Sequence, residues 1–195
     1  MGSQRGETPA VPHTASDLKV FLSVGHGLSG AQDRFVREIR TIVEDHGALL
    51  LTLSRDVELA ENPLLSVHDL IDGTSATLVI AFERLRIRSA IEYPDSDHQL
   101  PVADWRLTTV WNQVEAAMSF QAHHPLLILC EEGLHGEGIL QPDICARLKD
   151  PWAIQQLTFS HECLSVGPPK ALTRSVARWT SDLLKRSVAA SSTAR

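Results

Sequence analysis

Three glycines near the start of the chain have the spacing G-x-G-x-x-G, which is found where proteins bind a dinucleotide. Gly25, Gly27 and Gly30 lie in the stretch SVGHGLSGAQD, after an apolar run and before a run with helical spacing. Glycines let the backbone approach a pyrophosphate, and the amide hydrogens of a following helix point towards it. The stretch therefore predicts a nucleotide-binding turn. The residues of this turn that we expect to contact ribose or phosphate are Gly25, His26, Gly27 and Ser29.

A glutamate on a predicted helix is the candidate catalytic group. A buried helical stripe is expected from the spacing of Val110, Val114, Ala117 and Met118. Trp111 and Glu115 are four residues apart, so they lie about one turn from each other on a neighbouring face. A carboxylate at the edge of a buried stripe costs free energy unless it has a partner or a task. Glu115 is thus either half of a structural ion pair or a functional group.

Cleavage of an N-glycosidic bond is the reaction that suits a single carboxylate. The sugar becomes cationic as its base departs, and a nearby carboxylate stabilises or traps it. The nicotinamide of NAD leaves as a neutral molecule and needs no proton, whereas an ordinary purine or pyrimidine needs a general acid. His26 and His135 are the candidates for that acid. The His and Cys spacings match no zinc site, so we expect no metal.

The elements that would hold these residues alternate between strand and helix. Short apolar runs predict strands at 18–24, 48–53, 77–82, 125–130 and, more weakly, 156–160. Helical stripes are formed by Phe35, Ile39, Ile42 and Val43, and by Leu172, Val176, Trp179 and Leu183. Ser29 and Gln32 can form a capping box for the first helix, which Gly47 can end. The sequence predicts an α/β, flavodoxin-like three-layer sandwich with a mainly parallel sheet of about five strands.

One segment, residues 83–108, is too long for a plain connection and is expected to be an insertion or a lid. It leaves the carboxyl end of the third predicted strand, where ligands bind in open α/β sheets. Arg84, Arg86 and Arg88 alternate with apolar residues, so an extended conformation would place their guanidinium groups on one side. They would form a solvated strand edge or hold a phosphate. Phe82 and Arg84 are expected to flank the mouth of the pocket.

Length and composition fit a single soluble domain. We expect a domain over residues 17–188, with tails lacking fixed structure at 1–16 and 189–195. The net charge is -6 and lysine and arginine form no dense cluster, which disfavours nucleic acid as a partner. No apolar run is long enough to cross a membrane. Three scattered cysteines and the absence of a signal peptide indicate a cytoplasmic protein.

The order of these features resembles the TIR domain and the related nucleoside 2-deoxyribosyltransferase-like proteins. The resemblance covers roughly residues 18–165: the strand VFLSV, the glycine loop, DRFVREI, the strand SATLVIAF and then W-N-x-x-E. TIR domains often have W-C-x-x-E; here Asn112 replaces the cysteine between Trp111 and Glu115. The resemblance implies that Glu115 cleaves the nicotinamide–ribose bond of NAD, with Trp111 as its packing neighbour. Asn112 is expected to contact the substrate beside them.

The function that follows is nucleotide N-glycosidase, with NAD as a substrate rather than a cofactor. The resemblance also implies activation through a homo-oligomer or a partner protein, and a role in prokaryotic defence or signalling. Two alternatives remain open. The protein is a non-catalytic module that binds a nucleotide or a partner, or it is a Rossmann-type NAD(P)-dependent oxidoreductase. The latter needs an acidic residue at the end of the second strand, where Ser54 and Arg55 precede Asp56.

Overall fold

Five short runs of branched apolar residues form one parallel sheet. They are β1 (Lys19–Val24), β2 (Leu49–Leu51), β3 (Ala76–Ala81), β6 (Leu126–Glu131) and β7 (Ile154–Phe159). The strand order is β2-β1-β3-β6-β7, and every neighbouring pair is parallel. All residues of β3 and β6 are buried, as expected for strands covered on both faces. The five predicted strands are confirmed.

The structure, a computed structural model, describes residues 18–53, 62–147 and 153–193. The predicted tail at 1–16 lies outside these residues. None of the helices in the described part of the chain combines the length and the apolar character that a bilayer span requires.

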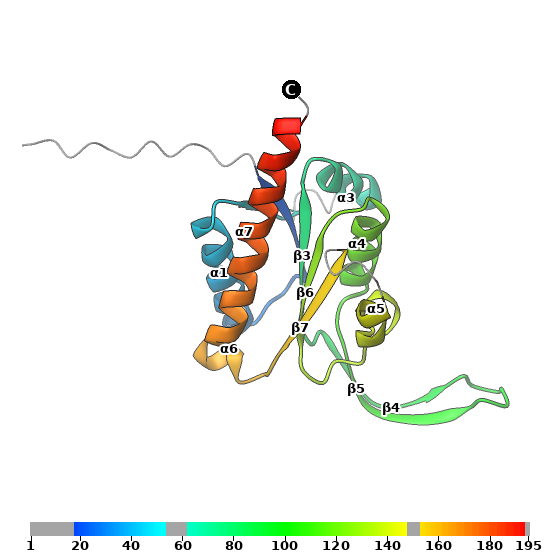
Figure 1. Ribbon diagram of the computed structural model, residues 1–195. Helices are drawn as coiled ribbons and strands as arrows, with labels where there is room; N and C mark the ends of the chain where they lie inside the picture. The colour runs from blue at the N-terminus through cyan, green and yellow to red at the C-terminus, as the bar shows by residue number, and fades with distance from the viewer. Residues whose placement is uncertain (1–17, 54–61, 148–152, 194–195) are drawn as a thin grey trace, which may run out of the picture.

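Helices cover both faces of the sheet (Figure 1). One layer contains α1 (Gly30–Asp45), α6 (Cys163–Val166) and α7 (Lys170–Thr193). The other contains α3 (Pro63–Asp72), α4 (Val110–Gln121), α5 (Pro142–Arg147) and the short 3-10 helix η1 (Gly138–Leu140). This arrangement confirms the predicted α/β, flavodoxin-like sandwich. Helix α7 continues beyond the domain boundary predicted at residue 188.

The first helix begins and ends as its sequence predicts. The Ser29 hydroxyl accepts a hydrogen bond from the Gln32 amide at 3.2 Å, and the Gln32 side chain accepts one from the Ser29 amide at 2.9 Å. Gly47 follows the helix with a φ of 85°, a conformation that favours glycine. This cap fixes where α1 starts, directly after the glycine loop.

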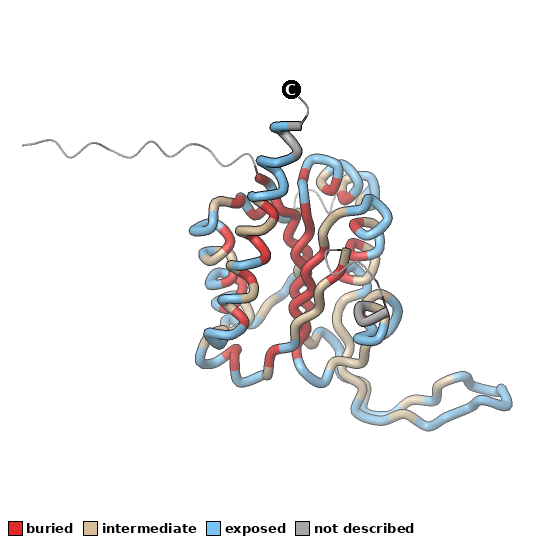
Figure 2. The backbone as a smooth tube through the Cα atoms, viewed as in Figure 1, coloured by how far each residue is buried: buried red, intermediate tan, exposed pale blue. Residues whose placement is uncertain are grey.

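The main core lies between the sheet and the layer of α1 and α7. Its helical side consists of Phe35, Ile39 and Val43 from α1, and Leu172, Val176, Trp179 and Leu183 from α7. Both predicted stripes are therefore confirmed, although Ile42 is only partly buried. Figure 2 shows that burial is concentrated in the sheet and in the faces of these helices that meet it.

The predicted stripe of α4 is wrong. Val110 is 74% exposed and Ala117 is exposed, whereas the buried residues of the helix are Asn112, Glu115, Ala116 and Ser119. The helix has apolar residues on most sides, so spacing alone did not determine which face turns inward. Hydrogen bonds inside the fold make a partly polar inner face acceptable: Thr77 donates to the Ser119 hydroxyl at 2.8 Å.

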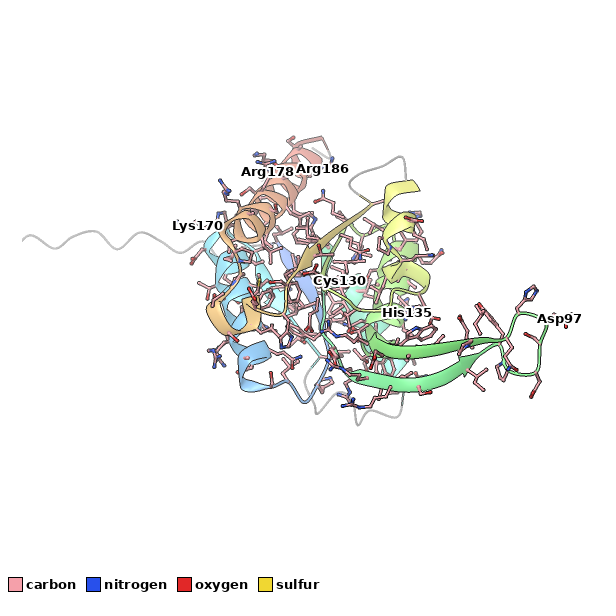
Figure 3. The ribbon with its side chains drawn as sticks, turned by 90° about the horizontal axis from the view of Figure 1, so that it is seen from below. Asp97, Cys130, His135, Lys170, Arg178 and Arg186 are labelled. Carbon is pink, nitrogen blue, oxygen red and sulfur yellow. The ribbon has the colours of Figure 1, made fainter. Side chains whose placement is uncertain are left out.

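Residues 83–108 form mainly an antiparallel hairpin of β4 (Leu85–Glu92) and β5 (Leu100–Leu107). The hairpin is a separate two-stranded sheet that projects from the body. Asp97 at its tip lies far from the sheet, whereas His135 lies beside its start (Figure 3). We call residues 82–84 and 106–109 the root of the hairpin. Only the root lies at the carboxyl end of the main sheet, and a lid role for the rest stays a prediction.

Candidate functional site

The candidate site lies at the carboxyl ends of β1 and β3. The chain passes from β1 to β2 on one side and then returns to β3 on the other, so the strand order reverses between β1 and β3. Ligands of open α/β sheets bind in the crevice at such a point. Here the glycine loop follows β1, the root of the hairpin follows β3, and α4 begins beside both. Two adjoining pockets result.

The first pocket, which we call the Glu115 pocket, has a volume of about 230 Å³. It is lined by Val24, Gly25, His26, Leu53, Pro63, Ser66, Val67, Thr109, Trp111 and Glu115. Glu115 is only 7% exposed, and Trp111, one turn earlier on α4, is 43% exposed. The helix therefore presents a buried carboxylate and a half-exposed aromatic ring to one cavity.

The second pocket, which we call the Arg84 pocket, has a volume of about 290 Å³. It is lined by Gly25, His26, Gly27, Leu28, Gln32, Phe82, Glu83, Arg84, Thr108, Thr109 and Asn112. Arg84 crosses from the root of the hairpin to the glycine loop, where its Nη1 donates to the His26 carbonyl at 2.7 Å. The two pockets share Gly25, His26 and Thr109, so one ligand can reach into both.

At two of the three motif positions the structure explains why the residue is glycine. A Cβ atom on Gly25 would lie 3.3 Å from Cγ2 of Thr109, which is closer than most such contacts. Gly27 has a φ of 70°, which strains residues with a side chain. Gly30 is the first residue of α1, and a Cβ there would meet nothing within 4 Å. The loop thus needs glycine where it approaches α4 and where it turns.

Asn112 is buried and connects three segments of the site. Its Nδ2 donates to Oγ of Ser23 at the end of β1 at 2.9 Å. Its Oδ1 accepts from Oγ1 of Thr108 in the root of the hairpin at 2.8 Å. Next to it, Oγ1 of Thr109 accepts from the Trp111 amide and caps α4. Asn112 lines the Arg84 pocket, but both ends of its amide also hold α4 in place.

The structure brings most of the predicted site residues together. Those on the walls of the two pockets are Gly25, His26, Gly27, Phe82, Arg84, Trp111, Asn112 and Glu115. Ser29 is on neither wall, because its hydroxyl caps α1. Its predicted contact with the substrate has no support in this arrangement.

Two further candidates serve the packing of the protein. Phe82 is buried, and its ring makes edge contacts with Phe35 and Phe159, each at a centroid distance of 5.8 Å. His135 stacks on Trp105 of β5 with ring centroids 3.7 Å apart and lines neither pocket. A general acid at His135 therefore has no support from the geometry.

A charged cluster at the root of the hairpin was not anticipated from the sequence. The side chain of Glu131, at the end of β6, is fully buried and accepts from the Glu83 amide at 2.8 Å and from Arg106 Nη2 at 2.8 Å. His161 Nδ1 lies 2.6 Å from the same carboxylate. The sequence signal for this cluster is the pair of glutamates, Glu131 and Glu132, at the end of an apolar run in PLLILCEE.

Glu83 joins this cluster to the hairpin. It accepts two hydrogen bonds from Arg86, at 2.7 and 2.8 Å, and one from Arg106 at 2.5 Å. These guanidinium groups, with Arg86 the larger influence, lower the pKa of Glu83 from 4.5 to about 2, although burial acts in the opposite direction. The cluster fixes the root of the hairpin against the sheet, and with it the position of Arg84.

No group of three or more His, Cys, Asp or Glu side chains able to hold a metal ion occurs among the described residues.

Comparisons with known proteins give limited similarity. No family model matches the chain, and no curated protein matches it. Among solved structures, it is similar to the CMP N-glycosidase BcmB of Clostridium botulinum, with 10% identity, a TM-score of 0.44, and coverage of 72% of this chain and 88% of that one. It is also similar to the diflavin flavoprotein A3 of Nostoc sp., with 11% identity, a TM-score of 0.44, and coverage of 85% and 89%.

Proposed function

We propose that the protein is a nucleotide N-glycosidase that cleaves the nicotinamide–ribose bond of NAD, with Glu115 as its catalytic carboxylate. The observation that carries the proposal is the position of Glu115. Its side chain is buried, yet it lies on the wall of a cavity that also includes Trp111 and the glycine loop. A carboxylate held in a buried position on a cavity wall, beside a half-exposed aromatic ring, supports a task there.

The reaction needs what this pocket can supply. The ribose becomes cationic in the transition state, and a carboxylate acts on such charge more strongly in a water-poor cavity than in bulk water. Nicotinamide carries its positive charge in NAD and departs as a neutral molecule, so no general acid is required. Water bonds to the ribose carbon in its place and releases a proton. His26 lies on the same wall and is the remaining candidate for a proton donor to other bases.

The size of the two pockets favours a ligand with two parts. Each is smaller than the roughly 300–1,000 Å³ of typical small-molecule sites, and they share part of their walls. A nicotinamide riboside unit would occupy the Glu115 pocket. The phosphates would enter the Arg84 pocket, which is lined by Gly27 of the glycine loop and by Gln32 in the first turn of α1. Arginine has five N–H donors, and Arg84 gives one to the His26 carbonyl.

The other two interpretations use the same crevice. The strand order β2-β1-β3-β6-β7 is that of flavodoxin-like folds, whereas the classic dinucleotide-binding Rossmann order is different. This order gives the oxidoreductase interpretation less support, and the acidic position that it requires, Asp56, lies outside the described residues. A non-catalytic nucleotide-binding module would use the same two pockets and differ only in lacking turnover.

The resemblance to TIR domains also suggests a cellular role for the proposed activity. On this basis the protein acts in defence or signalling and responds to assembly, through copies of itself or a partner protein. The assay below is therefore run over a wide range of protein concentration.

The test is release of nicotinamide from NAD by the purified protein, measured by chromatography. We expect turnover by the wild type and a loss of about 10²–10³-fold in kcat for Glu115→Gln, which keeps the shape and removes the charge. Glu162→Gln is the matched control, because Glu162 is exposed and lines neither pocket.

Three results would separate the interpretations. Full activity in Glu115→Gln contradicts the role of the carboxylate. NAD binding without nicotinamide release indicates a binding module. Reduction of NAD with an added substrate indicates an oxidoreductase.

A further inference from the structure

The hairpin has one face on which apolar side chains gather from both strands. In its register, Ile87 lies opposite Trp105 and Ile91 lies opposite Pro101. Because side chains alternate along a strand, these four residues share a face, on which Ser89 pairs with Ala103. Near the body His135 covers Trp105, but further out Ile91 is 56% exposed. The outer half of this face is open to water.

A two-stranded ribbon of this kind gains little stability by itself. Isolated hairpins are marginal in water and become stable when a third strand or a packed layer covers their apolar face. The outer hairpin extends away from both helical layers, and Figures 1 and 3 show no other described element beside its tip. The outer hairpin therefore has an apolar face that no described element of this chain covers.

The two edges of the hairpin differ in their capacity to pair. On β5, Pro101 has no amide hydrogen to offer to a further strand, and Asp104 has a φ of 54° that interrupts the extended backbone. Strand β4 has neither feature over Leu85–Glu92. Proteins protect edge strands with such backbone devices, so β4, which has neither, is the edge whose backbone is available for pairing.

We propose that two copies of this chain associate through their β4 strands, antiparallel about a two-fold axis beside Ser89. The result is a four-stranded sheet in which β4 of each copy is central. This register places Arg86 opposite the partner's Glu92 and Ile87 opposite the partner's Ile91. Each contact occurs twice because the interface is isologous.

The distribution of charge along β4 indicates that the strand pairing with it belongs to a second copy of this chain. Basic residues lie towards the root, at Arg86 and Arg88, and the acidic Glu92 lies towards the tip. An antiparallel copy brings Arg86, which also binds Glu83 of its own chain, opposite the partner's Glu92, whereas a parallel copy would place Arg86 beside the partner's Arg86. This inference is independent of the proposed function, since association is measured without any substrate.

Sedimentation of the full chain over a wide range of concentration is the first test. We expect a dimer of about twice the 21.5 kDa chain mass. Ile91→Lys should give a monomer, because it places a charge in the centre of the new sheet. Ala103→Lys is the matched control: Ala103 is exposed and lies on β5, opposite Ser89, on the same face of the hairpin as Ile91. It should remain a dimer.

A cross-link tests the axis itself. Directly opposed residues of antiparallel strands have Cα atoms about 4.5–5.5 Å apart, within the range of a disulfide. Ser89→Cys should therefore form a covalent dimer on oxidation, whereas Ala103→Cys, its neighbour on the protected strand, should not. Both variants are made in a Cys145→Ser background, and the other two native cysteines, Cys130 and Cys163, are buried.

The proposal is overturned if the wild type is a monomer throughout the concentration range. It is equally overturned by a dimer that survives Ile91→Lys, which would associate through another surface. Cross-linking of Ala103→Cys at the same rate as Ser89→Cys would contradict the β4 register.

Discussion

Replacing Glu83 with glutamine should destabilise the protein in a way that depends on pH. The hydrogen bonds from Arg86 and Arg106 lower the pKa of this carboxyl from 4.5 to about 2 in the folded protein. One pKa unit corresponds to about 1.4 kcal/mol, so the full shift corresponds to at most about 3 kcal/mol at pH 7. The side chain is 19% exposed, and water screens the interactions. We expect a loss of about 2 kcal/mol.

The direction of the pH dependence follows from the lowered pKa. The ionised carboxylate stabilises the folded state fully above its unfolded pKa of 4.5, and this contribution is lost as the pH falls through about 2. Glutamine resembles the protonated acid. The difference in unfolding free energy between wild type and Glu83→Gln should therefore shrink to about half by pH 3.

Urea unfolding of both proteins between pH 7 and pH 3, followed by circular dichroism, measures this difference. Glu162→Gln serves as the control, because Glu162 is exposed and no hydrogen bond from its side chain caps α6. The reasoning is refuted if Glu83→Gln unfolds like the wild type at pH 7. A difference that stays constant from pH 7 to pH 3 would also refute it, because the effect would then not come from the ionised group.

Three further predictions concern the site and the core. Asn112→Ala should lower the free energy of unfolding by about 1–3 kcal/mol, because it leaves the buried Ser23 hydroxyl without this hydrogen bond; urea unfolding measures the loss. Gly25→Ala should weaken NAD binding in calorimetry, because the new Cβ would lie 3.3 Å from the Thr109 methyl; adding Thr109→Ser removes that methyl, keeps the helix cap and should restore binding. Burial, reinforced by a neighbouring glutamate, raises the pKa of Cys130 to about 11, so Cys130 should resist iodoacetamide at pH 8 in the native protein and react after unfolding, as peptide mass spectrometry would show.

The sequence alone determined the sheet and the helical layer of α1 and α7. Continuous runs such as TLVIAF can be buried on both faces, which restricts them to central parallel strands. The stripe around Trp179 has the spacing of one helix face, and the capping box at Ser29 fixes where α1 begins. These signals are local, because each depends on residues a few positions apart along the chain.

Contacts between distant segments decided which face of α4 turns inward and which conformation residues 83–108 adopt. Asn112 turns inward because Ser23, far away in the sequence, holds its amide. The hairpin forms through cross-strand pairs such as Ile87 and Trp105. The alternation of Arg84, Arg86 and Arg88 indicates an extended conformation for the first strand only and gives no sign of its partner strand.

The site likewise combines what spacing suggests with what only the tertiary structure can place. The sequence indicated Glu115, Trp111 and the glycine loop by their types and spacing, but a shared pocket requires β1 and α4 to meet. The cluster of Glu83, Arg106 and Glu131 had no local signature beyond charges after strands. Charges separated by more than twenty residues become partners only when the carboxyl ends of β3 and β6 lie side by side. Local spacing fixes which elements form, and the tertiary fold decides which of their side chains meet.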